Sequence, residues 1–157
     1  MEHSKTPSYR SYQGGYFRTL IAPDQTGEAL AILELTLPRG GEPPPHIHTH
    51  EDEAFYVVEG TIDVTIAGKT TSLKAGEALF APKNVPHSFR ILTERATLLN
   101  LITPGRLWNY FIEFSQPLSE VPETVAAPAP PSPDVLSSMI HVITNTYKVT
   151  FVQPTNS

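Results

Sequence analysis

Alternation of hydrophobic and polar residues predicts a series of short β-strands along most of the chain. Ile62, Val64 and Ile66, for example, would share one face of an extended strand, with polar residues on the other face. Runs of this kind occupy residues 16–21, 29–37, 54–58, 61–66, 70–73, 78–81, 87–91 and 96–103. Turn-forming residues separate them about every eight to twelve residues, which is typical of an antiparallel sandwich or barrel. No strand–helix alternation is present, so the sequence predicts an all-β fold rather than a Rossmann-type parallel sheet.

The pattern changes after residue 104. Leu107, Phe111 and Phe114 recur at helical spacing and predict a short amphipathic helix packed on the edge of the sheet. Residues 117–133 hold six prolines, a composition that favours a linker or a covering arm. A second helix is predicted to begin near Ser132 and to end near Asn145. Its apolar stripe consists of Val135, Leu136, Met139, Ile140 and Ile143.

Three segments therefore make up the predicted domain organisation. Residues 1–15 form a polar arm, residues 16–115 form the barrel, and residues 116–157 form a proline-rich and helical extension. The extension ends in a predicted strand at residues 147–152. This strand could add to a sheet edge in the same subunit or in a partner subunit, and the sequence leaves both arrangements open.

Composition narrows the classes of function. The chain has no cysteine, which excludes disulfides, thiolate metal ligands and a cysteine nucleophile. Its net charge is −5 and its basic residues are scattered, which argues against nucleic acid or an anionic membrane as a partner. No signal-peptide pattern is present, and no apolar run reaches the roughly 18 residues of a membrane-spanning helix. We therefore expect a soluble cytoplasmic protein.

The stretch from residue 40 to residue 60 carries the candidate chemistry. His46 and His48 are two residues apart, so their imidazoles would lie on the same side of a strand. The carboxylate of Glu53 would come beside them if the run that follows pairs with their strand. Two imidazoles and a carboxylate suit a first-row divalent metal, but such a site needs a further protein ligand or open positions. His87, at the start of a later strand, is the best candidate for that ligand.

The spacing of these residues resembles the two sequence motifs of the cupin superfamily. The first motif is matched by Gly40, His46, His48, Glu53 and Gly60. The second motif is matched by Gly76, Pro82 and His87. The stretch around the first motif is also similar to that of single-domain, quercetin-dioxygenase-like cupins.

Two residues depart from the second motif. Asn84 stands where cupins usually have glycine, and Ile91 stands where they often have asparagine. Asparagine is one of the few residues that tolerate a left-handed backbone, so Asn84 is compatible with the expected turn. The position of Ile91 is not a ligand position in the family.

The resemblance implies a cupin jelly-roll β-barrel with a short helical and proline-rich C-terminal extension. It also implies one divalent transition metal, such as Fe, Mn, Ni, Co or Zn, held inside the barrel. The implied ligands are His46, His48, Glu53 and His87. Glu53 would either bind the metal or act as a base toward the substrate hydroxyl.

Metal affinity is expected to fall as the pH drops below about 6.5, because ligation requires neutral imidazoles. Metal titrations at pH ~5 and pH ~7.5 measure this effect. Equal affinities at the two values would contradict the assignment of the histidines as ligands.

Other residues near the motifs have two interpretations each. Phe55, Val57, Phe80 and Phe89 would line an apolar substrate pocket or belong to the barrel core. His50 comes two residues after His48, so on a continuous strand it would lie on the same face as His46 and His48. It is a candidate neighbour of the site, although the motif gives it no ligand role. Glu51 and Asp52 are expected to lie in a solvated turn.

The resemblance leaves several functions open. The first is a metal-dependent dioxygenase acting on a small chelating enol, flavonol or catechol-type substrate. The alternatives are a non-catalytic cupin that binds a small molecule, and an isomerase or epimerase of an anionic sugar or keto acid. Few basic residues lie near the motifs, which argues against a strongly anionic substrate. Cupins commonly pair through sheet edges, so a homodimer is expected.

Overall fold

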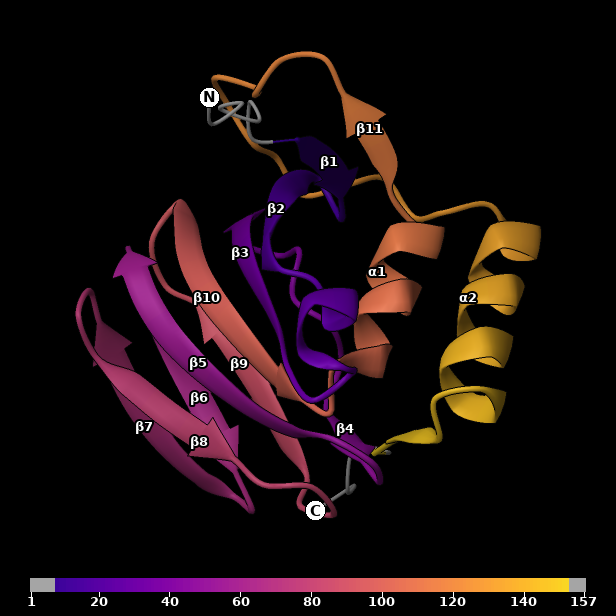
Figure 1. Cartoon of the computed structure of the whole chain (residues 1–157). Helices are drawn as coiled ribbons and strands as arrows, with labels where there is room; N and C mark the ends of the chain where they lie inside the picture. Colours follow the sequence, from indigo (N-terminus) through magenta and orange to yellow (C-terminus); the bar gives the residue numbers. More distant parts are fainter. Residues whose placement is uncertain (1–7, 153–157) are drawn as a thin grey trace, which may run out of the picture.

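Two antiparallel sheets face each other in the computed structural model, which describes residues 8–152 of the chain (Figure 1). In spatial order, the seven-stranded sheet contains β11 (Gln116–Leu118), β1 (Tyr9–Tyr12), β2 (Gly15–Ile21), β3 (Ala31–Pro38), β10 (Arg95–Thr103), β5 (Asp52–Glu59) and β8 (Ala78–Ala81). The five-stranded sheet contains β12 (Val149–Phe151), β4 (His46–His48), β9 (His87–Ile91), β6 (Thr61–Ile66) and β7 (Lys69–Lys74). This is the predicted jelly-roll architecture, and the predicted all-β fold class is confirmed.

The core lies between the two sheets and follows the alternation in the sequence. Ile62 and Val64 are fully buried, while the residues between them are less buried. Phe17 and Leu33 from the opposite sheet are also fully buried and belong to the same hydrophobic cluster. Strands such as β3, β5 and β6 thus place one face in the core, where most of the stabilising apolar burial occurs.

The helices lie together on one side of the molecule (Figure 1). They comprise two short 3₁₀ turns, Pro23–Thr26 and Gly105–Leu107, followed by α1 (Trp108–Glu113) and α2 (Pro133–Asn145). The side chain of Ser132 caps α2 by accepting a hydrogen bond from the Val135 backbone N–H at 3.4 Å. Within residues 8–152, no helix is long and apolar enough to cross a membrane.

Strand pairing at both ends of the chain extends the barrel. Residues Tyr9–Tyr12, predicted from the sequence to lie in a polar arm, form β1 and pair with both β2 and β11. The first seven residues of that arm lie outside the described residues. At the other end, β12 pairs with β4 of the same chain.

The strand pairing that would bring Glu53 beside the histidines along one sheet does not occur. Strand β5, which carries Glu53, does not pair with β4 but lies between β10 and β8 in the opposite sheet. The short turn after His48 carries the chain from one sheet to the other. Glu53 therefore approaches the histidines from across the interior rather than along one sheet.

Candidate metal centre

The structure brings the four predicted ligands together inside the barrel. His46 and His48 project from β4, and His87 is the first residue of β9, directly opposite His46 in the register. Glu53 comes from β5 of the facing sheet. One ligand atom from each of the four residues lies within 4.8 Å of the others. The cluster is therefore compatible with binding a single metal ion.

Glu53 is the centre of this cluster. Its Oε2 atom lies 3.0 Å from Nε2 of His87 and 3.3 Å from Nε2 of His48. Its Oε1 atom accepts a hydrogen bond from the Asn100 side-chain amide at 3.4 Å. Glu53, His48 and His87 are all buried. Asn100 thus holds Oε1 of the carboxylate, and Oε2 faces the imidazoles.

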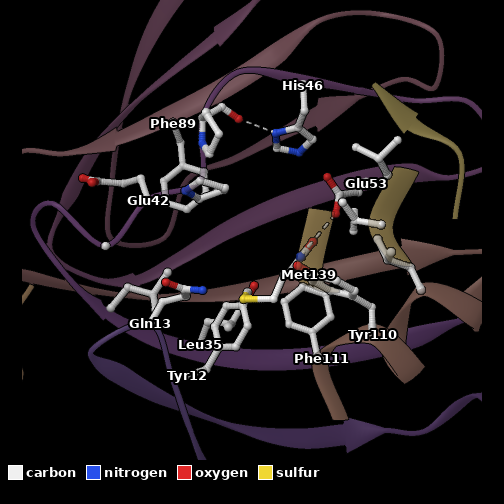
Figure 2. Close-up of a pocket in the computed structure, with 18 of the residues that line it drawn as sticks. Tyr12, Gln13, Leu35, Glu42, His46, Glu53, Phe89, Tyr110, Phe111 and Met139 are labelled. Atoms are coloured by element: carbon white, nitrogen blue, oxygen red, sulfur yellow. Dashed lines mark hydrogen bonds between the residues drawn. The ribbon is translucent and has the colours of Figure 1, made fainter. Parts of the chain in front are cut away.

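The Nδ1 atoms of His46 and His87 have hydrogen-bond partners outside the cluster. Nδ1 of His46 lies 2.7 Å from the Pro44 carbonyl oxygen, a contact drawn as a dashed line in Figure 2. Nδ1 of His87 lies 3.4 Å from the Val85 carbonyl. A carbonyl can only accept, so Nδ1 of each ring donates. Nε2 of His46 is then left with a free lone pair, whereas Nε2 of His87 makes a 3.0 Å hydrogen bond with Oε2 of Glu53. The Pro44 carbonyl therefore orients His46, and the prolines at residues 43–45 stiffen the loop that carries it.

The electrostatics of the cluster follow from burial and close charges. Burial alone would raise the pKa of Glu53, but the close charges of His48 and His87 and the hydrogen bond to His87 outweigh it and hold this pKa well below its usual value. Burial lowers the pKa of His46 to about 4, assisted by the charge of His48. Burial also acts to lower the pKa of His48, but the Glu53 carboxylate and Glu51 raise it to about 9. The site thus holds a buried anionic carboxylate among imidazoles.

The donor set fits a first-row divalent cation. Nε2 of His48 is buried and, despite its 3.3 Å contact with Glu53, makes no hydrogen bond of acceptable geometry with any described residue. A buried polar atom of this kind is costly unless something binds it. Imidazole nitrogens together with one carboxylate oxygen are ligands that Zn, Fe, Mn, Co and Ni accept. The metal that such a site prefers is not fixed by this donor set.

The cluster opens into a cavity of about 380 Å³ (Figure 2). In that view, Glu53 and His46 lie on one side of the cavity, and Tyr12 and Phe111 lie on the other. Most other lining residues are apolar and come from the sheets, α1 and α2. No lysine or arginine is among the lining residues within the described part of the chain. The cavity therefore suits a neutral, largely apolar molecule.

The structure places only some of the candidate pocket residues at the cavity. Phe55 and Phe89 line the cavity, but Val57 is fully buried in the core away from it. Phe80 is 57% exposed on the outer face. The reason is register: Ala81 of β8 lies opposite Glu53, so the neighbouring Phe80 points to the other side of the sheet.

His50 is exposed and does not line the cavity. Its side chain does not share the face of His46 and His48, because β4 ends at His48 and the chain bends immediately afterwards. Glu51, one residue later, is buried, so the expectation that it lies in a solvated turn is wrong.

Sequence reasoning missed several residues of the site and its cavity. Asn100 holds Glu53, Glu51 contacts His48, and Tyr12 of β1 lines the cavity. None of these lies at a motif position. The apolar stripe of α2 was a visible signal, because Leu136, Met139, Ile140 and Ile143 all line the cavity.

The expected backbone of the second motif is confirmed at Asn84. This residue has a φ of 64°, in the left-handed region. Its backbone N–H donates to the His48 carbonyl at 2.7 Å. The departure from glycine is therefore tolerated, and the turn ties the second motif to the strand that carries His46 and His48.

Residues 33–102 match the family model of the cupin domain, and this range includes all four residues of the cluster. This part of the chain is similar to the cupin domain. The family resemblance predicted from the two motifs is thereby confirmed.

Known proteins share parts of this cupin domain. The chain is 34% identical over 94 residues to polyketide synthase CurC of Streptomyces cyaneus, covering 59% of this chain and 61% of that protein. It is 25% identical over 100 residues to quercetin 2,3-dioxygenase of Bacillus subtilis, covering 64% of this chain and 30% of that protein. The chain thus spans less than two thirds of either relative.

A solved structure shares the fold. KdgF from Halomonas sp. superposes with a TM-score of 0.55 at 22% identity, covering 66% of this chain and 90% of that one. The N-terminal strand β1, helix α2 and strand β12 lie outside the matched family model.

Proposed function

We propose that this cupin is a metal-dependent dioxygenase that acts on small, planar, chelating compounds of the flavonol, enol or catechol type. The observation that carries the proposal is the position of the His/Glu cluster at the wall of an apolar cavity with aromatic lining residues. The relative named quercetin 2,3-dioxygenase supports the same substrate class, because quercetin is a flavonol.

In this proposal His46, His48, His87 and Glu53 hold the metal. When bound, the metal would act as a Lewis acid that polarises a substrate oxygen and lowers the pKa of a substrate hydroxyl. The partners of the imidazole Nδ1 atoms keep the rings oriented toward the site. Burial of the cluster excludes water from the reacting atoms.

In this proposal Glu53 receives the proton of the substrate hydroxyl. Its Oε1 atom is held by Asn100, so Oε2 is the oxygen that faces the site. Contacts of Oε2 with His48 and His87 help to keep the pKa of Glu53 low. Movement of Oε2 away from these rings would raise its proton affinity and let it act as a base.

The cavity would select the substrate by shape and polarity. A volume of about 380 Å³ is within the range of small-molecule sites. Tyr12, Phe55 and Phe111 offer aromatic surfaces against which a planar ring can pack. The absence of lysine and arginine among the described lining residues gives a phosphate or carboxylate group no cationic partner. This argues against the isomerase or epimerase alternative.

Oxygen consumption tests this proposal. In a dioxygenase reaction both atoms of O₂ enter the organic product, so no external reductant is required. Protein loaded separately with Fe, Mn, Ni and Co is expected to take up one O₂ per flavonol or catechol consumed with at least one metal. Metal-free protein and a Glu53→Gln variant serve as controls and should show no uptake. Substrate binding without O₂ uptake for every metal would contradict a dioxygenase and favour a non-catalytic binding protein.

A further inference from the structure

Glu51 is a buried carboxylate outside the cupin motifs. It lies in the turn between β4 and β5 and is 4% exposed. Its Oε2 atom lies 3.3 Å from Nδ1 of His48, the ring nitrogen opposite the one that faces Glu53. Burial of a carboxylate is costly, so a residue of this kind normally has a charged or hydrogen-bonding partner. The partner here is one of the proposed metal ligands.

No other group in the described part of the chain competes for this contact. Oε2 of Glu51 and Nδ1 of His48 are both buried, and neither makes a well-formed hydrogen bond to any residue between 8 and 152. Each atom therefore has the other as its polar neighbour. A small rotation of either side chain would convert the 3.3 Å contact into a full hydrogen bond.

The three histidines differ in what supports them. The Nδ1 atoms of His46 and His87 lie near neutral backbone carbonyls, those of Pro44 and Val85. His48 instead has a carboxylate. A carboxylate that accepts the Nδ1 proton fixes the tautomer with Nε2 free and makes that nitrogen a stronger electron donor to a metal. The support of His48 is therefore electronically different from that of the other two rings.

The backbone around Glu51 is held from two directions. The Thr49 hydroxyl donates to the Lys148 carbonyl at 2.8 Å, and the Asn84 N–H donates to the His48 carbonyl at 2.7 Å. Strand β12 also pairs with β4 so that Val149 lies opposite His48. The turn is thus preorganised to keep the Glu51 carboxylate behind the ring.

We propose that Glu51 is a positioning residue that holds His48 with Nδ1–H toward its carboxylate and Nε2 toward the metal. This inference rests on the proposed metal site. It assigns to Glu51 an effect on metal affinity and on the electronic environment of the metal, without direct contact with either metal or substrate.

The test compares Glu51→Ala, Glu51→Gln and a control, Glu59→Ala, which removes an exposed carboxylate from β5. Metal affinity is measured by competition with a chromophoric chelator, and the visible spectrum of the Co²⁺-loaded protein reports the ligand field. Glu51→Ala is expected to bind metal about 10- to 100-fold more weakly and to shift the Co²⁺ bands. Glu51→Gln should recover most of the affinity, because its amide oxygen still accepts from Nδ1–H. Glu59→Ala should match the wild type.

Two results distinguish this inference from the proposed function. If Glu51→Ala binds metal as tightly as the wild type with an unchanged Co²⁺ spectrum, Glu51 has no positioning role and the metal site stands. If the wild type binds no metal, the proposed function itself fails. Should Glu51→Ala not fold, Glu51→Asp decides the question. Its shorter side chain is expected to lower the affinity, and an affinity equal to the wild type would overturn the inference.

Discussion

A Glu53→Gln variant is expected to bind metal at least about a hundredfold more weakly than the wild type. Loss of a residue that only contacts a metal ligand costs up to about a hundredfold in affinity, so loss of a ligand should cost at least as much. Glu53 is the one anionic residue of the proposed ligand set, and its Oε2 atom lies 3.0 Å from Nε2 of His87. An amide oxygen carries no charge and is a weaker ligand for a divalent cation. The substitution keeps the size of the side chain, so its effect reports charge rather than packing.

Metal content after purification and chelator competition measure this effect. Glu59→Gln is the matched control, because it removes a carboxylate from the same strand at an exposed position. The control should bind metal like the wild type. Retention of full affinity by Glu53→Gln would show that the carboxylate is not a ligand and would leave the three histidines as the site.

The parts of the fold that the sequence predicts well are those set by local alternation. Strands β8 and β9 begin and end at the predicted residues, 78–81 and 87–91. In these runs the choice of inward and outward residues depends only on the period of two. The four clustered residues were also found from the sequence, but on the strength of the family spacing rather than of geometry.

The remainder depends on pairing between distant parts of the chain. Alternation does not say which sheet a strand joins, so the place of β5 opposite β4 could not be derived. Strand β1 pairs with β11 across more than a hundred residues, as Tyr9 lies opposite Leu118. Burial of Glu51 likewise depends on tertiary contacts, because the neighbouring Thr49 is held by Lys148 near the end of the chain. No local signal reports such contacts.

An Ile143→Asp variant is expected to release α2 from the barrel. Ile143 is the buried residue of this 13-residue helix and lines the cavity, whereas Leu136 and Ile140 are almost half exposed. An unpaired carboxylate in an apolar wall costs several kcal/mol, more than about 2. A surface helix that follows a proline-rich segment can escape this cost by undocking, which would remove one wall of the cavity.

Hydrogen exchange and ligand titration measure this undocking together. Amides of residues 134–145 should exchange faster in Ile143→Asp, while those of the core strand β6 stay protected. Flavonol affinity should fall about tenfold or more, because each 1.4 kcal/mol of lost apolar contact corresponds to a factor of ten.

Val135→Asp is the control: Val135 is 48% exposed in the first turn of α2, where a negative charge is favourable. If α2 remains protected and affinity is unchanged in Ile143→Asp, the helix is not a wall of the binding site. Loss of protection in β6 as well would instead show that docking of α2 is required for the stability of the whole barrel.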